Sequence, residues 1–188
     1  MGNVMQPEWL ERLKTAVKKN RSDAHNRYLQ LATIGVDGNP RVRMVVFRGF
    51  SDADASLFII TDARSAKIGE LTLSSAVEAS WYFTKTREQY RFTCDAVLYT
   101  PMNDPASHRG RLWSTLSEPA QSQFFWRSPG LPVGEGDALD RCGDDPPDTF
   151  VAVELLPRRV DHLVLGKTQR RTISERFDDE WSETPVNP

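Results

Sequence analysis

The residues whose types and spacing are best suited to binding or catalysis lie between positions 57 and 71. The apolar run Leu57–Ile60 has the character of a strand and leads through Thr61, Ser65 and Lys67 into helical spacing. The first turn of a helix carries unpaired N–H groups and the positive end of the helix dipole, and both favour an anion. Because two hydroxyls and an ammonium group meet at such a turn, the pattern predicts a phosphate site.

A plainer interpretation fits the same residues. Ser65 is a common N-cap type, and a lysine such as Lys67 often lies on a solvated helix face. Spacing alone does not separate a phosphate site from a capped helix with exposed cations. Both interpretations therefore stay open at this point.

Strand patterns precede the cluster and must position it. The segments Tyr28–Ile34 and Arg41–Phe50 have strand character, and the Asp-Gly pair at 37–38 predicts a hairpin turn between them. One face of the second strand carries Arg41, Arg43, Val45 and Phe47. This alternation places two cations inside an otherwise apolar strand.

Further elements are expected on both sides of this hairpin. Pro7–Lys19 has the pattern of an amphipathic helix, which should cover one mouth of a barrel. Val77–Phe83 and Gln89–Tyr99 are aromatic and β-branched runs that predict a second hairpin. One face of its second strand carries Gln89, Arg91 and Thr93, which point either at a ligand or at water.

The second half of the chain combines helices, a loop and strands. Pro105–Phe125 has helical spacing in two short pieces, and the aromatic triplet at 124–126 is interpreted as core or dimer interface in preference to a pocket wall. The Gly-, Pro- and Asp-rich segment 127–148 predicts a surface loop or lid. Thr149–Leu156 and Arg159–Leu165 have strand character, with Pro157 as a break between them.

The composition favours one domain that spans residues 1–188. The 188 residues are 39% hydrophobic, which is enough for one core. A net charge of −2 gives no basic bias toward nucleic acid or membrane surfaces. The sequence has no run long enough to span a membrane and no signal-peptide pattern, so a cytoplasmic protein is expected. Cys94 and Cys142 lack metal-ligand spacing and are expected to be free thiols.

Several of these segments resemble one family. RMVVFR at 43–48, ITD at 60–62, SAK at 65–67 and REQYR at 87–91 follow the order and spacing of the pyridoxamine 5'-phosphate oxidase family and its FMN-binding relatives. The family pattern is an Arg-x-Val-Leu-Leu-Lys strand, then Thr-Asn-x-x-Ser-Arg-Lys, then Arg-Gln-Val. The agreement covers about half of the chain. Ala66 departs from the family's usual Arg, and Arg48 departs from its Lys.

The resemblance implies an α+β fold, mainly β, in which a split β-barrel forms a homodimer and binds FMN between the subunits. In such a site Thr61, Ser65 and Lys67 hold the phosphate, and backbone groups of residues 44–46 meet the flavin ring. A basic residue of the closing segment, either Arg170 or Arg171, reaches the flavin. The implied cofactor-binding set is Arg43, Met44, Val45, Val46, Arg48, Ile60, Thr61, Ser65, Lys67, Gln89, Arg170 and Arg171.

The function expected from the resemblance is that of an FMN-dependent oxidoreductase acting on a small molecule. The family holds its substrate phosphate with a Tyr, an Arg and a Ser on one helix and with an Arg-Leu-His near the C-terminus. Neither set has a convincing match here, which predicts a different substrate. A genuine pyridoxamine 5'-phosphate oxidase and a non-catalytic flavin-binding module remain alternatives. A hydrolase is much less favoured, because His25, His108 and His162 lie in unrelated contexts without a nucleophile elbow.

Overall fold

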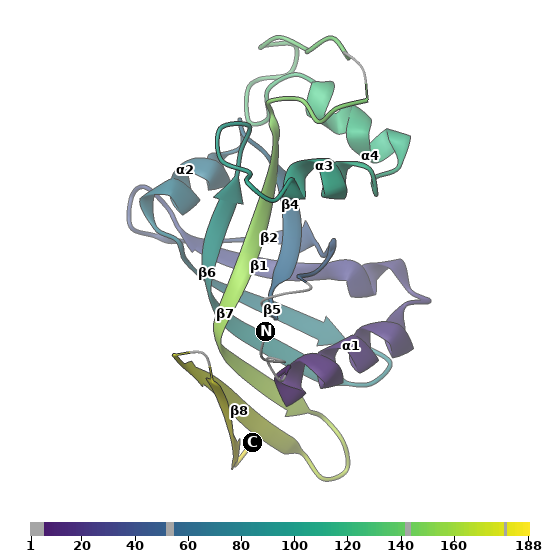
Figure 1. The fold of residues 1–188 in the computed structure, drawn as a ribbon, viewed down its shortest axis with the longest axis vertical. Helices are drawn as coiled ribbons and strands as arrows, with labels where there is room; N and C mark the ends of the chain where they lie inside the picture. Colours follow the sequence, from purple (N-terminus) through teal and green to yellow (C-terminus); the bar gives the residue numbers. More distant parts are fainter. Residues whose placement is uncertain (1–5, 52–54, 142–143, 179) are drawn as a thin grey trace.

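The computed structural model describes residues 6–51, 55–141, 144–178 and 180–188, which form one antiparallel sheet with short helices around it (Figure 1). The strands are β1 (Tyr28–Ile34), β2 (Pro40–Val46), β3 (Gly49–Phe50), β4 (Leu57–Asp62), β5 (Ala76–Phe83), β6 (Glu88–Tyr99), β7 (Phe150–Val164), β8 (Arg170–Phe177) and β9 (Glu180–Val186). The helices are α1 (Glu8–Asn20), α2 (Ala66–Leu73), α3 (His108–Trp113) and α4 (Glu118–Ser122), with 3-10 turns η1 (Ala24–Arg27) and η2 (Gln123–Phe125). The expected fold class, mainly β with helices, is confirmed.

The strands follow the order β2-β1-β5-β6-β7-β4-β3, and β8 pairs with β7 and β9. The two hairpins expected from the sequence are present as β1–β2 and β5–β6. The sheet curls until the chain just after β2 reaches β4, where the N–H of Arg48 donates to the carbonyl of Phe58 at 2.8 Å. The two ends of the sheet therefore meet at this point.

β2 keeps one edge free along most of its length. The N–H of Phe47 donates to the carbonyl of Arg27 at 2.8 Å, so Phe47 faces β1. In antiparallel strands, residues bonded to one neighbour alternate with residues whose N–H and C=O point the other way. Met44 and Val46 therefore point away from β1, and no strand pairs with that side of β2 in the part of the chain that the structure describes. Their backbone groups are accessible to a ligand or a second chain.

The strand expected over Arg41–Phe50 is divided. β2 ends at Val46, and residues 49–50 resume pairing as β3 against β4. The division occurs where the backbone changes partner, from β1 to β4, at Arg48. Gly49 has a φ of +153°, which residues with a side chain rarely adopt, and this conformation lets the chain change direction.

The break expected at Pro157 is wrong, because β7 continues over Phe150–Val164. One side of β7 pairs with β4 as far as Leu155 and with β8 from Arg159 onward, so Pro157 lies between two partners and no N–H donor is needed there. On the other side the register with β6 shifts, which leaves Arg158 as the extra residue of a β-bulge. A proline at a bulge bends the strand without ending it.

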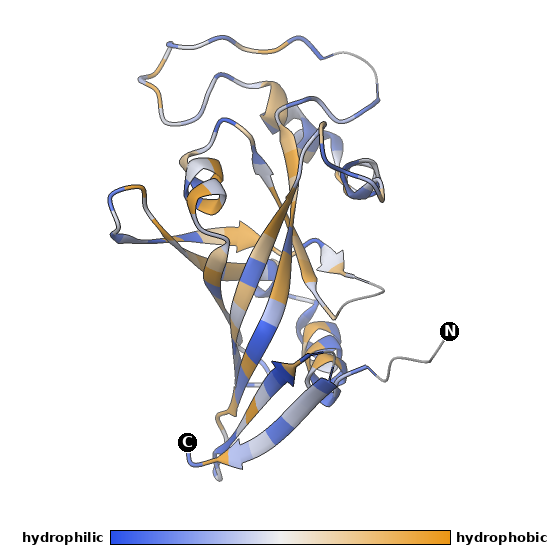
Figure 2. Cartoon of the chain, turned by 60° about the vertical axis from the view of Figure 1, so that its left-hand side comes forward, coloured by the Kyte–Doolittle hydropathy of each residue, from blue (hydrophilic) through white to orange (hydrophobic). Residues whose placement is uncertain are grey.

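Alternation along the strands divides the apolar side chains between two clusters. The larger cluster fills the inside of the curled sheet and includes Trp9, Leu10 and Leu13 of α1, so the amphipathic helix packs as expected. The smaller cluster includes Phe58 of β4 and Trp113 of α3. Figure 2 shows apolar residues along the central strands, whereas the hairpin β8–β9 is largely hydrophilic. β4 and the first part of β7 are thus covered on both faces, whereas β5 and β6 alternate between buried and more exposed residues.

Three further expectations concern the loop, the cysteines and the membrane. Segment 127–148 contains no helix or strand among its described residues, which agrees with a loop. Cys94 is buried and free, and Cys142 lies outside the described residues. No helix in the described ranges has both the length and the apolar character needed to cross a membrane.

Replacing Trp9 by Ala should destabilise the protein by ~3–5 kcal/mol. The indole is fully buried, with ring centroids 6.1 Å from Phe92 and 5.3 Å from Trp181. Urea unfolding followed by circular dichroism measures the change in unfolding free energy. Trp126→Ala is the control, because that side chain is 61% exposed and its loss should cost about 0.5 kcal/mol or less. Equal effects of the two replacements would contradict the packing assigned to α1.

Candidate functional site

Three polar side chains form a triangle at the start of α2. Thr61 belongs to β4, Ser65 is the N-cap residue of α2, and Lys67 lies in its first turn. The Lys67 ammonium group donates to Oγ1 of Thr61 at 2.8 Å and to Oγ of Ser65 at 3.0 Å, and the two hydroxyl oxygens are 3.1 Å apart. The residues that the sequence assigned to a phosphate therefore lie together.

The plainer interpretation, a serine that only caps the helix, does not match this geometry. Ser65 has the N-cap position but makes no side-chain hydrogen bond to a helix N–H. Its hydroxyl instead contacts Thr61 and Lys67. Lys67 is half-buried and forms no ion pair with a carboxylate among the described residues. A half-buried cation beside hydroxyls and the N–H groups of a helix start is suited to an anion.

The turn between β4 and α2 holds this triangle in place. Asp62 accepts from the backbone N–H of Arg64 at 2.7 Å and from its guanidinium group at 3.0 and 2.6 Å. The same guanidinium donates to the carbonyls of Phe124 at 3.3 Å and Trp126 at 2.9 Å. The hydrogen bond to Asp62 raises the pKa of the Arg64 guanidinium group. Arg64 thus ties the turn to the aromatic segment, and it is already engaged within the chain.

Arg43 lies in a buried network next to the triangle. It forms an ion pair with Glu70 of α2 and also donates to the hydroxyl of Thr33 in β1. The Thr33 hydroxyl donates to Oε2 of Glu70 at 2.6 Å. Glu70 is 6% exposed and Thr33 is 2% exposed. Arg43, expected as a direct cofactor contact, therefore joins β1 and β2 to the helix that carries Lys67.

Burial and charge act together on these groups. Burial lowers the pKa of Lys67 and the charge of Arg43 lowers it further, whereas Asp62 and Glu70 raise it. Burial alone would raise the pKa of Glu70, but the hydrogen bonds from Thr33 and Arg43 outweigh it, and this pKa lies below its usual value. Glu70 is therefore ionised at neutral pH and compensates Arg43. Lys67 is the cation left for a ligand among these groups.

Gln89 lies far from the triangle within one chain. It pairs with Leu163 of β7, whereas Thr61 pairs with Val151 of the same strand. These two pairing positions on β7, Leu163 and Val151, are twelve residues apart, which is a path of about 40 Å along the strand at the usual rise per residue. The structure does not bring Gln89 and Lys67 together in one subunit.

The two arginines of the closing segment lie near Gln89. In Figures 1 and 2 β8 is at the foot of the molecule, well below α2 in Figure 1. Arg171 and Gln89 both pair with Leu163 of β7, but Nε and Nη2 of Arg171 donate to Asp161, at 2.9 and 2.7 Å. The side chain of Arg170 makes no hydrogen bond or ion pair within the described ranges, and it lines a cavity of about 200 Å³ with Arg12 and three other residues. Arg170 is thus the unengaged cation of the two.

The remaining predicted contacts lie along β2 and β4. Met44, Val45 and Val46 are in β2, and Val45 points into the core while its neighbours flank the free edge. Arg48 follows that edge, and its Nε is buried without a hydrogen-bond partner in the described part of the chain. Burial lowers the pKa of Arg48, and the charge of nearby Arg27 lowers it further. Ile60 packs its side chain against the smaller core cluster, so only its backbone is free to face a cofactor.

The aromatic triplet at 124–126 has two different environments. Phe124 and Phe125 are buried against Trp113, with ring centroids 5.8 and 6.2 Å away, so they belong to the core. Trp126 is exposed. The interpretation of the triplet as core is confirmed for the first two residues.

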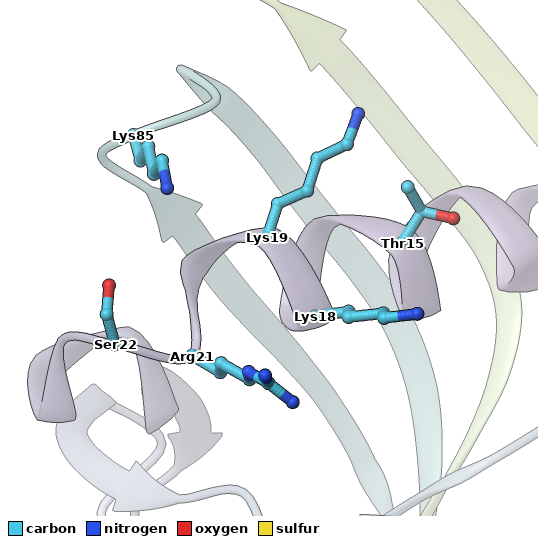
Figure 3. Close-up of a pocket in the computed structure, with 6 residues that line it drawn as sticks. All are labelled: Thr15, Lys18, Lys19, Arg21, Ser22 and Lys85. Carbon is cyan, nitrogen blue, oxygen red and sulfur yellow. The ribbon is translucent and has the colours of Figure 1, made fainter.

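The larger of the two best-defined cavities, about 550 Å³, lies at the end of α1, away from the triangle. It is lined by Thr15, Lys18, Lys19, Arg21, Ser22 and Lys85. Figure 3 shows Lys19 extending to one side of the helix while Lys18 and Arg21 extend along the other. These charged groups diverge, whereas those of the Thr61–Ser65–Lys67 triangle converge. The cavity is therefore not the candidate site.

Sequence reasoning missed three residues that support the site. Glu70 follows Lys67 by one helical turn. It adjoins the buried Leu71, and a carboxylate at such a position needs a buried partner, which is the signal that could have identified Glu70. Thr33 shares the inner face of its strand with Leu29 and Leu31. A hydroxyl on that apolar face likewise needs a buried hydrogen-bond partner. Arg64 had no such signal, because its partners are carbonyls from a distant segment.

The sequence matches a known family model. Residues 6–100 match the model described as the FMN-binding domain of pyridoxamine 5'-phosphate oxidase. A curated Arabidopsis thaliana protein, pyridoxine/pyridoxamine 5'-phosphate oxidase 2, is 32% identical over 199 aligned positions that cover all of both chains.

Solved structures share the fold. A pyridoxamine 5'-phosphate oxidase-related, FMN-binding protein from Nostoc punctiforme is 37% identical, with a TM-score of 0.87 over 97% of this chain and 99% of that one. PhzG from Burkholderia lata, solved with tetrahydrophenazine-1-carboxylic acid, is 22% identical, with a TM-score of 0.73 over 96% and 91% of the chains. This chain therefore belongs to the pyridoxamine 5'-phosphate oxidase family of FMN-binding proteins, and its curled sheet is the split β-barrel of that family.

Proposed function

We propose that this protein is an FMN-dependent oxidoreductase that acts on a small molecule other than pyridoxamine 5'-phosphate. The observation that carries the proposal is the convergence of Lys67 with the hydroxyls of Thr61 and Ser65 at 2.8 and 3.0 Å. Family membership identifies FMN as the cofactor. The residues present fit its phosphate, because the triangle offers an ammonium group, two hydroxyls and a helix start with no carboxylate in it.

The free edge of β2 supports the placement of the flavin ring. Met44 and Val46 direct backbone N–H and C=O groups away from β1, and a flavin carries hydrogen-bonding groups along one edge of its ring. Arg48 lies at the end of this edge, and its buried Nε has no hydrogen-bond partner among the residues that the structure describes. These residues would orient the ring and place a positive charge beside it.

FMN, when bound, supplies the reversible acceptance of electrons from a substrate. The chain's own residues would bind the phosphate, orient the ring and exclude water from it. A cation from the closing segment would offset negative charge on the reduced ring, and Arg170 is free to do so because Arg171 is occupied by Asp161. The proposal requires no side chain to act as an acid or a base.

FMN should bind much more tightly than riboflavin, and Lys67→Ala should remove most of that difference. Loss of the charge-assisted bonds from Lys67 should cost ~1.5–3 kcal/mol, or roughly tenfold to a hundredfold in Kd, for FMN alone. Titration of the apoprotein followed by flavin fluorescence measures both constants. Lys14→Ala is the control, because Lys14 is an α1 lysine paired with Glu11 at 3.0 Å. Equal affinity of the unmodified protein for FMN and riboflavin would refute the phosphate site.

The separation of Gln89 and Arg170 from Lys67 favours a site shared by two subunits. The outer face of the sheet also presents a group of apolar side chains, of which Val42 is 70%, Met44 55%, Tyr82 41% and Tyr28 40% exposed. The pairing of β1 with β2 and β5 places these residues on one face. An apolar face of this kind commonly forms an interface. Phe124 and Phe125, which the sequence offered for the interface, are buried within the chain instead.

We expect a homodimer in solution, and Val42→Arg should convert it to monomer with weaker FMN binding, because a charge would enter an apolar interface. Light scattering of the FMN-loaded protein measures the mass. Val133→Arg is the control, since Val133 is fully exposed in the 127–148 loop. A tight FMN complex that is monomeric would contradict the shared site.

The proposal of a different substrate depends on how many arginines are available to bind a second phosphate, because several of them already contact other groups within the chain. Arg109 is 9% exposed and donates to the carbonyls of Phe150 and Pro147, at 2.8 and 2.7 Å. Arg111 lies over the ring of Phe58, 5.0 Å from its centroid. The closing segment has Thr172 where the family pattern has His, and Arg171 is paired with Asp161. Few cations remain for a second phosphate dianion.

A genuine pyridoxamine 5'-phosphate oxidase is the second candidate. The Arabidopsis protein with that name matches the whole chain at 32% identity, which favours a shared reaction. Under this alternative Arg48 would hold the substrate phosphate together with Arg109 and Arg111, which would have to leave the contacts that engage them within the chain.

We expect pyridoxamine 5'-phosphate to be a poor substrate of the FMN-loaded protein. Each missing charge-assisted bond should cost ~1.5–3 kcal/mol of substrate binding, so several together should reduce capture by orders of magnitude. Steady-state oxygen consumption measures the rate. A kcat/KM above about 10⁴ M⁻¹s⁻¹ would refute this expectation and establish the second candidate.

A further inference from the structure

Two cations approach the proposed phosphate site from different elements. Lys67 comes from α2 and Arg43 from β2, and the charge of Arg43 is close enough to lower the pKa of Lys67. Glu70 follows Lys67 by three residues, which places both on neighbouring positions of the helix surface. Its carboxylate is buried and contacts both Arg43 and Thr33.

We propose that Glu70 sets the net charge of the phosphate site. It holds Arg43 as a neutral ion pair, so a ligand meets one uncompensated positive charge, that of Lys67. This inference rests on the proposed function, because it assumes that the triangle binds the phosphate of FMN. It adds a residue that opposes anion binding while it keeps the empty site stable.

The physical reason is the cost of placing two cations together in a partly buried site. Without Glu70, Arg43 would be a partly buried charge without its partner, and such a charge strongly destabilises a fold. With Glu70 present, Arg43 joins β1, β2 and α2, but its attraction for the ligand is largely cancelled. Ala66, which replaces the family's usual Arg, removes another cation from the same turn. The site is therefore weakly charged, and the carboxylate is the group that limits its affinity.

The decisive variant is Glu70→Gln, which keeps the size and the hydrogen-bond acceptor of the side chain but removes its charge. We expect FMN to bind about fivefold to tenfold more tightly and riboflavin to bind as before, with the gain shrinking as salt is raised. Flavin fluorescence titration of the apoprotein at two salt concentrations measures both ligands. Glu11→Gln is the control, because Glu11 is an exposed carboxylate on α1 that pairs with Lys14 at 3.0 Å.

Arg43→Gln and the double variant Arg43→Gln/Glu70→Gln complete the set. Arg43→Gln should weaken FMN binding, because Glu70 then has no cation and repels the phosphate. The double variant should bind FMN more tightly than Arg43→Gln does, since it also removes the carboxylate that repels the phosphate. It also leaves no unpaired buried charge, so it tests the inference even where Glu70→Gln fails to fold.

A readout without flavin separates this inference from the proposed function. The charged groups that act on Lys67 are Arg43 from β2, Asp62 from the end of β4 and Glu70 from its own helix. Removing the charge of Glu70 should lower the pKa of the Lys67 ammonium group, measured by NMR titration, whichever anion the site binds. If the unmodified protein prefers riboflavin or binds both flavins equally, the phosphate site fails while the pKa shift still tests Glu70. If Glu70→Gln leaves FMN affinity and that pKa unchanged, or weakens both flavins equally, Glu70 is only a scaffold and the inference is overturned.

Discussion

The hydrogen bond from the N–H of Arg48 to the carbonyl of Phe58 determines where the sheet closes, and the site depends on that position. Had β2 paired with β4 along its whole length, the N–H and C=O groups of Met44 and Val46 would be used within the sheet. Closure at the end of β2 leaves them free and brings the β4–α2 turn beside β2. Closure at this position thus leaves the backbone groups proposed to contact the flavin next to the element that carries Lys67.

The charged groups around the β4–α2 turn then determine which ligand the candidate site suits. The turn that follows β4 is secured by the Asp62–Arg64 pair, and the helix after it by the Glu70–Arg43 pair. Each pair uses its charge for structure and presents little of it to a ligand. Lys67, with hydroxyls as its partners, is the exception. One ammonium group, two hydroxyls and a helix start match a single phosphate group better than a diphosphate, which would bring more negative charge.

Much of the fold was predictable from local pattern. Alternation in Tyr28–Ile34 and the Asp-Gly turn at 37–38 identified the first hairpin, and the apolar stripe of α1 identified a helix that packs on the sheet. The errors have a common physical cause. Pro157 and residues 47–50 lie where a strand changes partner, and a single strand's pattern carries no information on where one neighbour ends and the next begins. The Thr61–Ser65–Lys67 triangle was predictable because its residues are close in sequence.

The partners of these residues were not predictable in the same way. Arg43 looked like a ligand-binding cation because cations are rare inside apolar strands, but its partner, Glu70, comes from an element 27 residues later. A charged residue in an otherwise apolar strand indicates that an ion-pair partner exists, but only the folded structure identifies that partner. For Arg48 the described chain provides no such partner for Nε, which is why its assignment to the cofactor remains a prediction.

The residues proposed to bind FMN form two groups that lie far apart along β7. Lys67 lies at the β4–α2 turn, whereas Gln89 and Arg170 lie about 40 Å away along β7, near the hydrophilic hairpin β8–β9 (Figure 2). The proposed function therefore requires these two groups to contact one FMN from different subunits. The bulge at Arg158 bends β7 and carries β8 away from the rest of the barrel, where it pairs with β7 and β9 alone among the described strands. The hairpin is anchored on its own subunit by Trp181, whose ring lies 5.3 Å from that of Trp9, and by the Glu183–Arg12 pair at 2.7 Å, which leaves Arg170 as the residue proposed to reach a partner.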